Sequence, residues 1–170
     1  MNIELNKPQR IEPGPGQESV WDFPRPPRVE PVEKLVKVVL NGVTIAETRS
    51  AKRVLETASA PVYYIPPEDI RMDLLSLSRG GSTLCEWKGY ADYIDVEVEG
   101  KRVPKAAWFY ANPTQGYESI KGHLAFYAQK MDACYVDDER VRSQPGIFYG
   151  GWVTDDIVGP IKGEPGSEGW

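Results

Sequence analysis

Val36-Lys-Val-Val-Leu-Asn-Gly-Val-Thr-Ile-Ala-Glu-Thr48 is the stretch of sequence that decides the fold. Two runs rich in β-branched residues, Val36–Leu40 and Val43–Thr48, flank the pair Asn41-Gly42. Asn-Gly is the pair best suited to a type I′ turn, because both turn residues must adopt a positive φ. The sequence therefore predicts a β-hairpin over residues 36–48.

Short strand-like segments follow this hairpin, separated by glycine, proline or asparagine. The further predicted strands are residues 53–57, 61–65, 83–88, 90–99, 103–111, 123–129, 133–136 and 147–154. Apolar residues in helical spacing follow Pro66-Pro67, which predicts a short helix there. A parallel sheet would need more connecting helices than this one, so antiparallel pairing is expected. The sequence thus predicts a mainly β protein, a small antiparallel roll of β-tent or barrel-like form, with one short helix at about residues 67–75.

Proline dominates the N-terminal part of the chain. Seven prolines lie between Met1 and Pro31, and each fixes φ and removes a backbone donor. We predict an extended proline-rich arm over residues 1–31, a single β domain over residues 32–158 and a turn-rich C-terminal strap over residues 159–170.

Composition excludes several classes of protein. The net charge of −5 is spread along the chain without a stripe of lysine and arginine, so nucleic acid is not an expected partner. Cys85 and Cys134 form no C-x-x-C pair, so neither a disulfide framework nor a metal site is expected, and no cofactor is indicated. No apolar run approaches the roughly 20 residues of a membrane span, and no targeting pattern is visible. We expect a cytoplasmic protein without a membrane partner.

Four motifs in fixed order resemble the domain of unknown function 427 family: Val62–Ile70, Cys85–Tyr93, Ala106–Tyr110 and Ala125–Tyr127. The likeness covers approximately residues 36–137. It implies a β-tent-like fold, similar in outline to methionine sulfoxide reductase B and to small zinc-bearing guanine-exchange-factor-like proteins, with a cavity between its sheets. The zinc is not carried over, because the paired cysteines that hold it are absent here. The family is catalogued in places as a nucleotidyltransferase, but the resemblance implies no known activity.

Aromatic residues recur on the predicted strands beside a few charged groups. Such a mixture suits a pocket, since rings supply rigid apolar area and charges orient a ligand. The alternative is that most of these rings fill the core of a small β domain. The resemblance favours a cavity, and the residues that match polar or aromatic positions of its motifs are predicted to line it: Glu56, Tyr64, Asp69, Lys88, Tyr93, Trp108 and Tyr110.

Three residues are candidates for catalysis. Asp95 and Glu97 follow Gly80-Gly81-Ser82 at a spacing that resembles a nucleotidyltransferase signature, in which two carboxylates hold magnesium. The favoured alternative makes both acids the solvent face of a hairpin strand whose opposite face is apolar. His123 is the only histidine and hence the candidate for histidine-based acid–base catalysis, with a structural role as the alternative.

These observations support three hypotheses for function. The leading one is a β domain that binds an unknown small molecule in an aromatic-lined cavity. The second is an enzyme that uses the same cavity for nucleotidyl transfer or hydrolysis. The third is an interaction domain whose arm and strap dock onto a partner or onto a second copy in a homodimer. Residues 144–152 and the tail to Trp170 are a candidate lid, in which Gly150-Gly151 serves either hinge motion or a tight turn or bulge.

Overall fold

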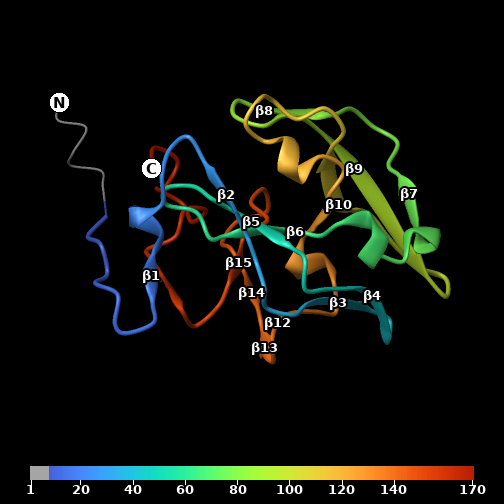
Figure 1. The fold of residues 1–170 in the computed structure, drawn as a ribbon, viewed down its shortest axis with the longest axis horizontal. Coiled ribbons are helices and arrows are strands. Elements are labelled where there is room, and N and C mark those ends of the chain that lie inside the picture. The colour runs from blue at the N-terminus through green and yellow to red at the C-terminus, as the bar shows by residue number, and fades with distance from the viewer. Residues whose placement is uncertain (1–7) are drawn as a thin grey trace.

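The computed structural model describes residues 8–170, whose strands form several small sheets (Figure 1). One four-stranded sheet contains the predicted hairpin, in the order β13 (Glu139–Arg140), β12 (Ala133–Val136), β3 (Val36–Leu40) and β4 (Val43–Thr48). Asn41 and Gly42 have φ values of 50° and 77°, as a type I′ turn requires. The hairpin prediction is confirmed.

A five-stranded sheet forms the second layer. Its order is β11 (Ala125–Phe126), β10 (Lys101–Tyr110), β9 (Gly89–Val98) and β7 (Leu75–Leu77), and β8 (Thr83–Cys85) pairs with the other half of β9. A three-stranded sheet contains β2 (Arg28–Pro31), β5 (Lys52–Leu55) and β6 (Val62–Tyr64). These pairings are all antiparallel, and none of the sheets within residues 8–170 closes into a barrel. The mainly β, antiparallel fold is confirmed.

The helix predicted at residues 67–75 is wrong. The segment forms two separate 3-10 turns, Pro67–Asp69 and Met72–Leu74. Between them Ile70 forms a bridge with Ala46, and the Arg71 N–H donates to the Ile45 carbonyl at 2.8 Å. This pairing buries Ile70, so a tertiary contact overrides the local helical spacing. The other 3-10 turns are Val20–Asp22, Glu118–Ile120 and Ala128–Lys130. No helix of the described part is long and apolar enough to cross a membrane.

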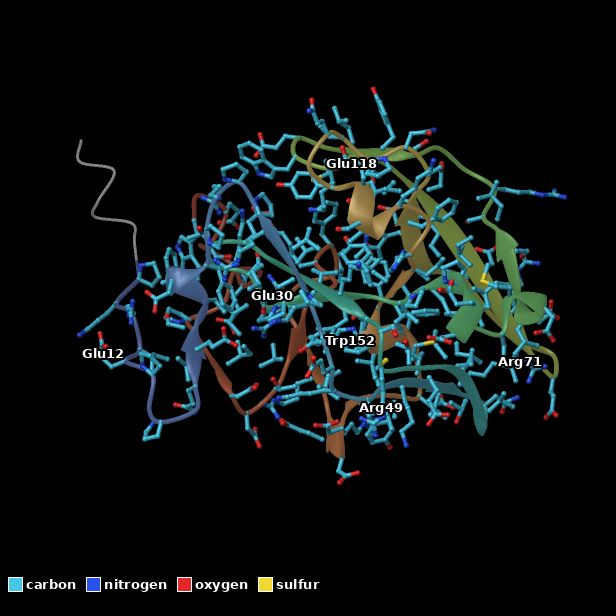
Figure 2. All side chains as sticks on the ribbon, viewed as in Figure 1. Glu12, Glu30, Arg49, Arg71, Glu118 and Trp152 are labelled. Carbon is cyan, nitrogen blue, oxygen red and sulfur yellow. The ribbon has the colours of Figure 1, made fainter. Side chains whose placement is uncertain are left out.

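Successive side chains of β6 point to opposite sides, into two different hydrophobic cores. Tyr63 stacks on Trp152 with ring centroids 5.2 Å apart, in the main core between the four-stranded and five-stranded sheets. Trp152 is 1% exposed and lies in the interior in Figure 2. Tyr64 points to the opposite side and joins a second, aromatic cluster with Trp108 and Tyr110. Strand geometry therefore places one tyrosine in the core and the next beside the cavity described below.

The arm pairs with the end of the predicted β domain and contacts the strap. β1 (Glu18–Ser19) runs parallel to β16 (Ile157–Val158), and β14 (Arg142–Ser143) pairs with β15 (Trp152–Val153). Trp21 donates its indole N–H to the Pro160 carbonyl at 2.9 Å. β2, within the predicted arm, is one of the two edge strands of the three-stranded sheet, which suits a segment ending in proline. Residues 1–7 of the predicted arm lie outside the described residues.

Candidate functional site

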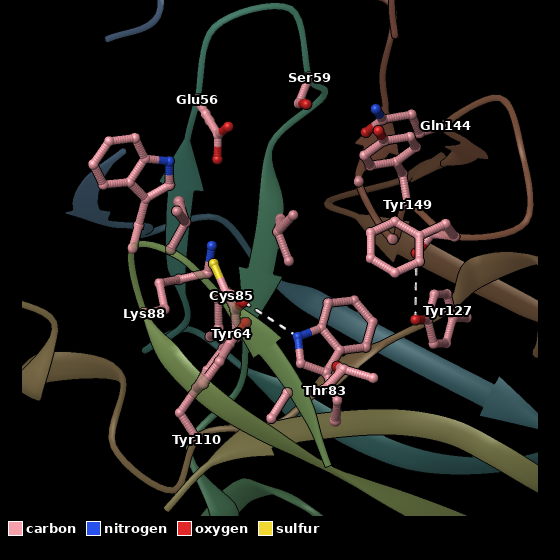
Figure 3. Close-up of a pocket in the computed structure, with 18 of the residues that line it drawn as sticks. Glu56, Ser59, Tyr64, Thr83, Cys85, Lys88, Tyr110, Tyr127, Gln144 and Tyr149 are labelled. Carbon is pink, nitrogen blue, oxygen red and sulfur yellow. Dashed lines mark hydrogen bonds between the residues drawn. The ribbon is translucent and has the colours of Figure 1, made fainter. Parts of the chain in front are cut away.

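A cavity of about 310 Å³ lies where the three-stranded sheet faces the five-stranded sheet (Figure 3). β5 and β6 form one wall, and β8, β9 and β10 form another. A third side is closed by residues 144–151, which connect β14 to β15. Leu84 and Phe148 line the mouth and are both 66% exposed.

Trp108 is the centre of the aromatic wall. Its indole N–H donates to the Tyr64 hydroxyl at 3.3 Å, and its ring packs on Tyr127 with centroids 4.6 Å apart. Tyr110, two residues further along β10, lies 6.4 Å from the Tyr64 ring. These rings fix one another through ring packing and the Trp108–Tyr64 hydrogen bond, so the wall is rigid without a bound molecule.

Lys88 brings a positive charge into the cavity. It lies in the turn between β8 and β9 and is only 9% exposed. Its amine lies next to the sulfur of Cys85 (Figure 3). Burial alone would lower the pKa of the amine, but nearby Tyr64, Cys85 and Glu56 outweigh burial and hold the pKa above its ordinary value. Lys88 is therefore an ammonium ion at neutral pH.

Three further charged groups border the cavity. Glu56 faces Arg25 at 3.7 Å, which offsets the charge of its carboxylate, and Glu86 is exposed. Lys162, from the strap, donates from its amine to the main-chain oxygen of Trp170 at 3.3 Å and lies 5.5 Å from the centroid of the Tyr149 ring. The lining thus carries two acids and two lysines, of which Lys88 alone is buried.

Gly150 and Gly151 allow the 144–151 segment to pack against the walls. A Cβ on Gly150 would lie 2.1 Å from the Trp108 ring, and one on Gly151 would lie 2.5 Å from the Ala60 carbonyl. Neither glycine has a positive φ, so close approach explains them better than a hinge or a tight turn. Gln144 fixes the start of the segment, because its side chain accepts from the Ala60 N–H at 3.1 Å.

Six of the seven residues predicted to bind a ligand line this cavity: Glu56, Tyr64, Lys88, Tyr93, Trp108 and Tyr110. Asp69 does not. Its carboxylate accepts from the Thr48 hydroxyl at 2.7 Å, in the first 3-10 turn after β6. The predicted set left out other lining residues, among them Trp87, Tyr127, Phe148, Tyr149 and Lys162. Trp87 and Tyr127 belong to the aromatic residues that recur on the predicted strands, so a signal for them existed, whereas Lys162 of the strap has no local pattern.

Asp95 is not on a solvent face, and that expectation is wrong. It is 4% exposed and accepts from the Lys105 N–H at 2.9 Å and from Arg102 at 2.7 Å. The cause is a bulge in β10 between Val103 and Ala107, where Lys105 has a φ of 48° and turns its N–H toward the carboxylate. The Lys105 N–H, and then Arg102, hold the pKa of Asp95 below its ordinary value.

The other residues of the nucleotidyl-transfer hypothesis lie apart. Glu97 is exposed. Gly80 and Gly81 border a hollow of about 40 Å³ with Tyr93 and Lys105, which neither acid lines. The described structure therefore does not join the glycines and the two carboxylates in one site.

His123 lies outside the cavity. Its Nδ1 is 3.2 Å from the Lys121 carbonyl oxygen, two residues away. Cys134 is buried in the main core, where burial raises the pKa of its thiol to about 12, so it is no nucleophile for this histidine. Within residues 8–170, no three His, Cys, Asp or Glu side chains are grouped to hold a metal ion.

Comparison with known proteins places the chain in a family. No curated protein matches the sequence. One family model, NTP_transf_9, matches residues 28–137, which include the strands of both cavity walls. With well over half of its length matched, the chain belongs to the family described as "Domain of unknown function (DUF427)".

Proposed function

We propose that the protein binds a small molecule in the cavity between β5–β6 and β8–β10. The observation that carries this proposal is the rigid aromatic wall around Trp108, whose hydrogen bond to Tyr64 and packing on Tyr127 leave about 310 Å³ open in front of them. This volume falls at the lower end of the range of about 300 to 1,000 Å³ for small-molecule sites. A metabolite-sized ligand fits better than a cofactor with several ring systems.

The described geometry favours binding over the two alternatives. Nucleotidyl transfer, which the family's short name suggests, needs carboxylates free to hold magnesium, and Asp95 is already bonded to Lys105 and Arg102. An interaction domain needs an arm that is free to dock, whereas β1 and β2 are already paired with β16 and β5. Both remain weaker explanations of the cavity.

Native mass spectrometry of the freshly purified full chain tests the proposal. We expect a non-covalent mass that disappears on denaturation. Thr83→Trp, a change at an exposed residue of the cavity wall, should remove this mass because the indole fills the entrance. Thr44→Trp, at an exposed residue of β4 outside the cavity, is the matched control and should retain it.

Two outcomes contradict the proposal. One is an extra mass that Thr83→Trp retains, since the ligand would then lie elsewhere. The other is a protein without any extra mass whose melting temperature no member of a metabolite library raises, because a ligand that binds the folded state must stabilise it.

A further inference from the structure

We infer that the cavity takes an anionic, ring-bearing small molecule, with its acidic group on the Lys88 ammonium and its ring against Trp108 and Tyr127. This inference rests on the proposed function and names the class of ligand. Two observations carry it: a buried cation without a carboxylate partner, and an indole N–H without an acceptor.

Lys88 is buried without a carboxylate partner, and its amine lies next to the Cys85 sulfur and 5.9 Å from the centroid of the Tyr110 ring. Among residues 8–170 no carboxylate oxygen lies within 4.0 Å of its amine, although the residue is only 9% exposed. Arg53 shows how this chain otherwise treats a cation that is largely buried, since it contacts both Glu18 and Glu30. A buried charge is costly unless it is paired. The missing partner of Lys88 is therefore supplied from outside the chain.

Lys162 reaches the cavity from the strap, and its amine donates to the main-chain oxygen of Trp170 at 3.3 Å. The acids that line the cavity are Glu56, which shares its charge with Arg25, and Glu86, which is exposed. Lys88 is thus the one buried charge among the lining residues, and its field favours an anion over a neutral or cationic molecule.

The turn that contains Lys88 offers another donor. The indole nitrogen of Trp87 is buried and has no hydrogen-bond partner in the described structure. A buried donor without an acceptor costs about 1–3 kcal/mol. An oxyanion at Lys88 would bring acceptor oxygens to this turn, where two neighbouring side chains lack them.

The rest of the cavity suits a ring. Trp108 and Tyr127 form one wall, and Phe148 and Tyr149 pack edge to face with centroids 5.3 Å apart on the adjoining 144–151 segment, whose Phe148 carbonyl accepts from the Tyr127 hydroxyl at 3.4 Å. Rings bind such surfaces by stacking or edge contacts. A carboxylate and a phosphate monoester share the required charge, and the experiment separates them.

Isothermal titration of the full chain with matched probes tests the inference. 1-Naphthoate and 1-naphthamide have nearly the same size and differ in charge, and 1-naphthyl phosphate carries the alternative acidic group. We expect one of the two anions to bind at least about tenfold more tightly than the amide, as a charge-assisted hydrogen bond implies. Lys88→Met should remove this preference, and Lys88→Arg should retain most of it.

Lys121→Met is the matched control, since it removes an exposed lysine outside the cavity. It should leave the preference unchanged. If Lys88→Met fails to fold, the ratio of the anion affinity to the amide affinity in the unsubstituted protein still decides whether the cavity prefers an anion. Equal binding of all three probes would overturn the inference and leave the proposed function standing. Binding of none of them would overturn it as well, and native mass spectrometry would then judge the proposed function separately.

Discussion

Replacing Gly150 with alanine should reshape the cavity and destabilise the protein. The added Cβ would lie 2.1 and 2.7 Å from two carbons of the Trp108 ring. Carbon atoms in contact are normally about 3.5–4.0 Å apart, so the ring or the segment must move by about 1.5 Å.

Neither side can move freely. Trp108 lies in β10 between Tyr93 and Ala125, and its indole is bonded to Tyr64. The Gly151 carbonyl accepts a hydrogen bond from the Gln144 N–H at 2.9 Å, and this bond opposes displacement of the 144–151 segment. Overpacking of this kind costs about 1–3 kcal/mol.

Urea unfolding followed by tryptophan fluorescence measures this cost. The midpoint should fall by about 0.5–1.5 M at an unchanged slope of about 2 kcal/mol/M. Gly81→Ala is the control, because a Cβ added there would meet no atom within 4 Å and the φ of Gly81 is ordinary. A Gly150→Ala protein that unfolds at the same urea concentration as the unsubstituted chain would refute the close approach of this segment to Trp108.

Three further changes test other parts of the fold. Asp95→Asn should lower the free energy of unfolding by about 1–3 kcal/mol at pH 7. The Lys105 N–H lowers the pKa of Asp95 in the folded protein. The difference in stability between the variant and the unsubstituted protein is therefore present above the unfolded pKa of about 3.9 and vanishes as the pH falls through the folded pKa. A difference that does not shrink in urea titrations as the pH is lowered below about 3.9 would contradict this role. Arg53→Met leaves the carboxylates of Glu18 and Glu30 without their cation. A protease should therefore cut residues 9–30 faster in this variant than in Arg49→Met, a control at an exposed arginine. Equal rates of cutting would argue against the ion network. Trp152→Phe removes the indole N–H that donates to the Phe126 carbonyl at 2.9 Å, and urea unfolding should show a loss of about 1–3 kcal/mol; an unchanged midpoint would mean that water or another donor replaces it.

Local signals predicted the parts of the fold that neighbouring residues determine. The hairpin around Asn41-Gly42 follows from turn chemistry and alternation within 13 residues, and the long strands β9 and β10 follow from alternation alone. The two-residue strands β1, β14 and β16 could not be predicted, because they exist only through their partners. The helix predicted at residues 67–75 is wrong for a related reason, since the pairing of Ile70 with Ala46 cannot be seen in the local sequence pattern.

The residues of the candidate site were likewise predictable from the sequence only in part. Trp108 and Tyr110 were both predicted to line the cavity, and they do so from one face of β10 because they are two residues apart on a strand. Asp69 matched a polar motif position, yet its carboxylate is engaged by Thr48. Tyr149 and Lys162 come from segments without regular structure, and only the folded chain brings them to the cavity.

The pairing of β1 with β16 has a consequence for the order in which the chain folds. The hydrogen bond from Trp21 to Pro160 joins residues 139 positions apart, and contacts of such separation carry the largest loop-closure entropy. During synthesis the arm emerges first, but Val20 and Phe23 have no Ile157 to pack against until residues 157–170 have left the ribosome. We therefore expect the arm to be seated late, and because Lys162 lies in the same C-terminal stretch, the lining of the cavity is completed at that stage.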